Sequence, residues 1–170
     1  GHSKIVNSLN NLASLYKAQN RLKDAEPLLQ EALAINKANL SVGHLDIAQS
    51  LYNLARLYKA QNRLAEAEPL YQESLEILKA TLPAGHPDIV ANQQNLVVLY
   101  YEQCQYSQSE KALFRLLKQK MSSPRIDEEA LKDDLAFLYR IYKTMGLDNP
   151  TERVSEAMVS LINNIASNRQ

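Results

Sequence analysis

The eight-residue stretch LYKAQNRL occupies residues 15–22 and returns unchanged at residues 57–64. The two copies lie 42 residues apart, and residues 1–42 match residues 43–84 at 27 of 42 positions without a gap. The same register continues into residues 85–126 and, weakly, into residues 127–168. A period of this length is typical of repeat proteins, in which each unit buries its apolar face against its neighbours. The chain is therefore interpreted as an array of four repeats.

Each repeat has the apolar periodicity of two helices. In the first half of the first repeat, an apolar stripe falls at i, i+3, i+4 and i+7: Leu9, Leu12, Ala13 and Tyr16. The second half repeats this spacing: Ala25, Leu28, Leu29, Ala32 and Leu33. Two columns keep a large aliphatic residue in all four repeats: Leu12, Leu54, Leu96 and Leu138, and Leu15, Leu57, Leu99 and Ile141. These columns predict the core of an all-α chain.

Helix breaks are predicted near residues 20–22, 40–45, 62–64, 82–86, 104–106, 122–127 and 146–150. The turn within each repeat carries one residue of a shared column: Asn20, Asn62, Cys104 and Gly146. Asn and Gly tolerate the left-handed conformation that ends many helices, whereas Cys has no such preference. The third turn is therefore expected to be built differently, with Cys104 buried or half-buried as a packing residue. Pro87 and Asp88 in GHPDI, residues 85–89, favour a helix start.

Composition removes several classes of function. The chain has 19 basic and 19 acidic side chains and a pI near 7.0, which argues against a nucleic-acid partner. Its single cysteine excludes an internal disulfide framework, and no apolar run approaches the roughly 18 residues of a membrane span. We therefore expect a cytoplasmic protein that does not bind membranes.

An enzyme is also disfavoured. His2, His44 and His86 recur once per repeat, so packed helices would hold them roughly 10 Å apart, too far to share one metal ion. Cys104 lies 18 helical residues from His86, which separates the pair by about 27 Å. No glycine-rich phosphate loop and no serine elbow occurs. The sequence predicts no catalytic residue, no metal and no cofactor.

The segments GHPDI, NNLA, LYKAQNR and AEPL resemble the tetratricopeptide repeat of the kinesin-light-chain type, whose repeats are 42 residues long. The resemblance implies a right-handed superhelical α-solenoid of helix pairs whose first helices line a concave peptide-binding groove. It predicts one continuous domain, with three repeats at 1–42, 43–84 and 85–126. Residues 127–170 are interpreted as a divergent fourth helix pair that caps the array.

A column of asparagines lies beside the apolar stripe: Asn11, Asn53 and Asn95, with Phe137 in the fourth repeat. Asparagine in a helix interior costs several tenths of a kcal/mol relative to alanine, so its recurrence needs a reason. The amides either form hydrogen bonds between repeats or bind a peptide backbone, for which they offer both donor and acceptor. The family resemblance favours the second role.

The remaining peptide-binding candidates are expected on the same face as these asparagines: Lys17, Tyr52, Arg56, Lys59, Val98 and Tyr101. Arg140, Lys143, Glu102 and Asp133 are expected on this face as well, which gives five cations against two anions although the chain is neutral overall. If this bias is functional, the partner is a protein segment that is acidic, phosphorylated or ends in its carboxylate. The alternative function is homodimerisation, either through the first helix pair, which has no polar closing element and would expose apolar surface, or through the divergent last pair.

Overall fold

The computed structural model describes residues 1–121 and 128–167, and the regular structure in them is helical. The helices are α1 (His2–Ala18), α2 (Leu22–Asn39), α3 (Leu45–Ala60), α4 (Leu64–Thr81), α5 (Pro87–Glu102), α6 (Tyr106–Met121), α7 (Glu128–Thr144) and α8 (Pro150–Ser167). The predicted breaks fall between these helices, except that the break at 122–127 lies outside the described residues.

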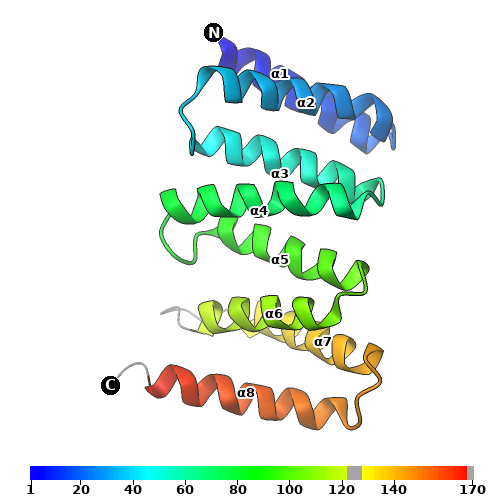
Figure 1. The fold of residues 1–170 in the computed structure, drawn as a ribbon, viewed down its shortest axis with the longest axis vertical. Coiled ribbons are helices and arrows are strands. Elements are labelled where there is room, and N and C mark those ends of the chain that lie inside the picture. Colours follow the sequence, from blue (N-terminus) through cyan, green and yellow to red (C-terminus); the bar gives the residue numbers. More distant parts are fainter. Residues whose placement is uncertain (122–127, 168–170) are drawn as a thin grey trace. The chain divides into compact units, whose positions relative to one another are not determined.

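The chain divides into two compact units, Gly1–Asn92 and Gln93–Gln170. In the first unit α1 packs against α2, α2 against α3, and α3 against α4 (Figure 1). In the second unit α6 packs against α7, and α7 against α8. The predicted all-α fold of sequential helix pairs is confirmed. A single continuous domain, a right-handed superhelix and a capping role for residues 127–170 stay predictions.

The turns within the repeats end their first helices in one common way. The residues at the turn column all have positive φ: Asn20 at 59°, Asn62 at 60°, Cys104 at 60° and Gly146 at 68°. In the first turn the N–H of Asn20 donates to the carbonyl of Lys17 at 3.0 Å, and the N–H of Arg21 donates to that of Tyr16 at 2.8 Å. These two bonds form a Schellman motif, which satisfies carbonyls that the helix end would otherwise leave unpaired.

The expectation for the third turn was wrong. Cys104 repeats the Schellman motif, because its N–H donates to Tyr101 at 3.0 Å and the next N–H, of Gln105, donates to Tyr100 at 2.8 Å. Its side chain is also exposed, not buried or half-buried. Cys104 lies just outside the end of α5, and this position accounts for both its left-handed backbone and its exposed side chain. The backbone hydrogen bonds hold the cysteine in a conformation that asparagine adopts more readily.

The repeated phrase also links the first two repeats. The guanidinium of Arg63 lies 4.0 Å from the centre of the Tyr58 ring and contacts Glu26 on α2 at 2.8 Å. Gln30, also on α2, donates a hydrogen bond to the Tyr58 hydroxyl at 3.0 Å. Partial burial by itself raises the pKa of Glu26, but hydrogen bonds from Arg63 and other neighbours lower it overall. The carboxylate therefore stays charged and holds α2 to the end of α3.

The core follows the predicted columns in three repeats but not in the first. Leu54, Leu96 and Leu138 are at most 5% exposed, and Leu57, Leu99 and Ile141 are fully buried. Leu12 is 40% exposed and Leu15 is 53% exposed, so the prediction that they belong to the core was wrong. In the first unit α3 packs against both α2 and α4, whereas α1 packs against α2.

Candidate functional site

Four polar side chains follow one another along α3, in the first unit. The Nε2 atom of Gln49 donates a hydrogen bond to Oδ1 of Asn53 at 3.1 Å. The guanidinium of Arg56 lies 5.8 Å from the centre of the Tyr52 ring. Tyr52 and Asn53 are half-buried and Arg56 is exposed, so a ligand can reach all three. The fold therefore places Tyr52, Asn53 and Arg56, predicted from sequence, together on one helix.

Two cations on different helices, Lys17 and Arg56, repel each other electrostatically. Burial lowers the pKa of Lys17, on α1, and the positive charge of Arg56 on α3 lowers it further. Both side chains are positively charged, so an anion placed near Lys17 and Arg56 would be attracted by both and would reduce their mutual repulsion. We refer to the predicted residues on these two helices as the α1–α3 surface: Asn11, Lys17, Tyr52, Asn53, Arg56 and Lys59.

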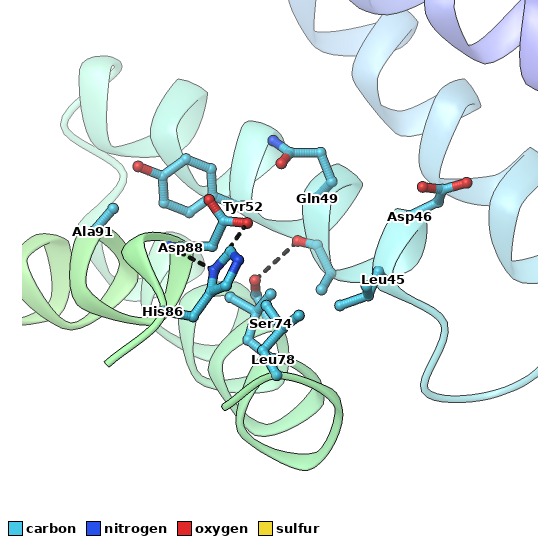
Figure 2. A pocket seen from close by; sticks show the side chains of 11 residues that line it. Leu45, Asp46, Gln49, Tyr52, Ser74, Leu78, His86, Asp88 and Ala91 are labelled. Carbon is cyan, nitrogen blue, oxygen red and sulfur yellow. Dashed lines mark hydrogen bonds and ion pairs between the residues drawn. The ribbon is translucent and has the colours of Figure 1, made fainter. Parts of the chain in front are cut away.

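A cavity of about 300 Å³ adjoins the α1–α3 surface at Tyr52 (Figure 2). All of its walls belong to the first unit: Leu45, Asp46, Ala48, Gln49, Tyr52, Ser74, Leu78, Leu82, His86, Asp88 and Ala91. The Tyr52 ring also contacts the buried Tyr71 ring edge-on, with centroids 5.8 Å apart. The aromatic side chain at this wall is thus held in place by the core.

Sequence reasoning missed the polar groups of this cavity. His44 and His86 accept hydrogen bonds at Nδ1 from the backbone N–H groups of Asp46 and Asp88, at 3.1 and 3.2 Å. These bonds cap the N-termini of α3 and α5, which gives the histidine a structural role in the second and third repeats. The two carboxylates extend into solvent, with side chains 61% and 60% exposed. The sequence pattern from which these helix caps could have been predicted is Gly-His-x-Asp-Ile, at residues 43–47 and 85–89.

The other predicted site residues, Asn95, Val98 and Tyr101, belong to the second unit. Val98 lines a cavity of about 280 Å³ together with Phe137. The Tyr101 ring contacts Phe137 at 5.3 Å between centroids, and its hydroxyl lies 2.9 Å from Oγ1 of Thr144. Tyr101 therefore already has structural partners, whereas Val98 has a cavity beside it. Peptide binding by these three residues stays a prediction.

Two further properties concern the described residues only. None of their helices combines the length and the apolar character needed to cross a bilayer. Within the same residues, no three His, Cys, Asp or Glu side chains lie together as a metal site would require.

Residues 4–80 match the tetratricopeptide repeat family. This match covers the first two repeats, and the fold of the chain is similar to that of kinesin-light-chain-like arrays. Domains with such repeats are generally protein-interaction modules and are typically not catalytic. No curated protein sequence is significantly similar to this chain.

Two solved structures illustrate the likeness in fold. A candidate kinesin light chain of Podosopora anserina with nearly identical TPR-like repeats is 24% identical, with a TM-score of 0.76 over 97% of this chain and 76% of that chain. BtubC (BKLC) from P. vanneervenii is 22% identical, with a TM-score of 0.78 over 95% of this chain and 66% of that chain.

Proposed function

We propose that the chain is a non-catalytic scaffold whose α1–α3 surface binds an acidic, extended segment of a partner protein. The observation that supports this proposal is the electrostatic repulsion between Lys17 and Arg56, which an anionic side chain near both would relieve. Asn53 lies one turn from Arg56 and offers an amide to the peptide backbone. A cytoplasmic location is part of this proposal.

The expected affinity is modest. Each hydrogen bond to the peptide contributes only about 0.5–1.5 kcal/mol net, whereas micromolar binding requires about 8 kcal/mol. Amide contacts at Asn11 and Asn53 therefore need help from charge pairing and from side chains that bury apolar surface near Tyr52. We expect dissociation constants in the micromolar range.

Asn53→Ala should weaken peptide binding about fivefold to tenfold, because the lost hydrogen bonds correspond to about 1 kcal/mol or slightly more. The melting temperature should change little, since the hydrogen bond that Asn53 accepts from Gln49 is exposed to solvent. The measurement is fluorescence polarisation of labelled nine-residue peptides with varied Asp and Glu positions, with melting curves in parallel. A variant that melts early but binds normally would show that the asparagine column is structural.

Replacing Arg56 and Lys59 together by glutamate should weaken the same peptides at least tenfold and flatten the dependence of binding on salt. Exposed charges act over a Debye length of about 8 Å at physiological ionic strength, so wild-type binding should fall as salt rises. The matched control is Lys23→Glu with Lys79→Glu, which reverses two exposed charges outside the α1–α3 surface. Equal losses in both double variants would indicate only a general charge effect and would contradict the proposal.

A second candidate function is homodimerisation through the outer face of α1. Ile5 and Leu15 are each 53% exposed, although their counterparts one repeat later, Ile47 and Leu57, are at most 4% exposed. This face therefore has the composition of an interface between repeats, and exposed apolar patches of this kind favour association. If it forms a dimer, Leu15→Glu should yield monomers at concentrations where light scattering shows wild-type dimers. A wild-type chain that stays monomeric across a dilution series would rule out this function.

A further inference from the structure

We propose that the cavity beside Tyr52 is a subsite for a long cationic side chain, arginine or lysine, of the bound peptide. The inference rests on the proposed function, because it assigns a second contact to the same peptide. It adds a requirement that the cations of the α1–α3 surface do not suggest: the partner segment carries a basic residue as well as acidic ones.

The walls of the cavity suit an amphipathic cation. Leu45, Ala48, Leu78 and Leu82 provide apolar surface for an aliphatic stem. The carboxylates of Asp46 and Asp88 reach solvent from different helices, and Figure 2 shows Asp46 well apart from Asp88 across the view. Long cationic side chains bury their methylene groups and keep the charged head at a wet, acidic edge.

The polar atoms of the cavity also favour a cation over an anion. No lysine or arginine is among its lining residues. The Nδ1 atom of His86 accepts the N–H of Asp88, so the neutral imidazole carries its proton on Nε2. With neutral histidine, the formal charge of the lining is that of two carboxylates.

The two ends of α3 therefore present opposite charges on either side of Tyr52. Asp46 lies in the first turn, and Arg56 lies ten residues later, which is about 15 Å along the helix. A peptide crossing α3 at Tyr52 can place a basic side chain toward Asp46 and an acidic one toward Arg56. Complementary charges at two separate points would fix the register of the peptide, which a single charged contact cannot do.

The cavity lies between residues of the second repeat and the start of the third, and it is not a general product of the repeat geometry. One period earlier, Tyr52, Asp46 and Leu78 correspond to Asn10, Lys4 and Asn36. Asn36 is only 2% exposed, and its amide donates to the carbonyl of Asp46 at 3.1 Å and to Oγ of Ser50 at 2.9 Å. The first repeat thus has a cation in place of an acid and a bonded amide in place of a leucine.

The test uses a probe that does not depend on an acidic peptide. N-acetyl-arginine N-methylamide and its lysine analogue are titrated into the full chain, and the methyl signals of Ala48 and Ala91 are followed by NMR. Both probes should shift these signals saturably, and Asp88→Asn should weaken binding of the probes at least threefold. Asp46→Asn is a second variant, on another helix, in case the first fails to fold. Glu76→Gln, an exposed carboxylate on α4, is the control and should leave binding unchanged.

Three results would overturn the inference. The probes would cause no saturable shifts, the uncharged norleucine analogue would bind as well as arginine, or both Asp variants would bind like the wild type. If the cationic probes bind the cavity while no acidic peptide binds the chain, the proposed function fails and the subsite stands. If acidic peptides bind but their affinity is unchanged when each basic residue is replaced by norleucine, the subsite fails and the proposed function stands.

Discussion

Leu57→Ala should lower the free energy of unfolding by about 2–5 kcal/mol, as truncation of buried leucines does. Leu57 is fully buried, so the substitution leaves a cavity in the core in addition to removing apolar contacts. Chemical denaturation followed by far-UV circular dichroism would measure the loss. Leu57 lies in the first unit, which has its own packed helices. The unfolding transition of this unit is therefore the one to compare between the wild type and the variant.

Leu15→Ala is the matched control, because Leu15 is the first residue of the same octapeptide one repeat earlier. It is 53% exposed, and we expect a loss of about 1 kcal/mol or less. Lys79→Ala, at an exposed position on α4, should cost under about 0.5 kcal/mol. Equal losses for Leu15 and Leu57 would show that α1 is covered in solution, which would favour homodimerisation.

Lys120→Ala should destabilise the second unit by about 3 kcal/mol. The Nζ atom of Lys120, on α6, lies 2.6 Å from Oδ2 of Asp134 on α7, and the side chains are only 14% and 9% exposed. Removal of one partner from such a pair leaves the other charge without compensation in a poorly solvated place. Thermal and chemical unfolding of the wild type and the variant would measure this loss.

Replacing both Lys120 and Asp134 tests whether the loss in the single variant comes from leaving one buried charge uncompensated. Lys120→Met with Asp134→Leu should be within about 1 kcal/mol of the wild type or more stable, because hydrophobic replacements avoid the desolvation of two charges. The cavity of about 280 Å³ that Asp134 borders leaves room for the larger side chain. A double variant as unstable as Lys120→Ala would mean that the pair is needed for α6–α7 packing itself.

The local structure of this chain could be predicted because it depends on neighbouring residues. Apolar spacing of three and four residues located the helices, and Asn20, Asn62 and Gly146 marked turns whose left-handed conformation they tolerate. The candidate site was predicted in part for the same reason. Tyr52, Asn53 and Arg56 share one helix face, so the spacing alone brings them together.

The rest of the candidate site depends on contacts between helices. The electrostatic interaction between Lys17 and Arg56 depends on where α1 and α3 lie in space, and the cavity beside Tyr52 needs walls from α3, α4 and α5. The role of His44 and His86 as acceptors for the N–H groups of Asp46 and Asp88 also depends on side-chain geometry.

The sequence by itself determined the period, the eight helices and the columns that can form a core, because these follow from short-range spacing and from repetition. It did not determine which members of a column are buried. Leu15 and Leu57 belong to identical octapeptides, yet the first is half exposed and the second fully buried. Only the tertiary structure decided this, because burial requires neighbouring helices, and α3 packs against both α2 and α4 whereas α1 packs against α2.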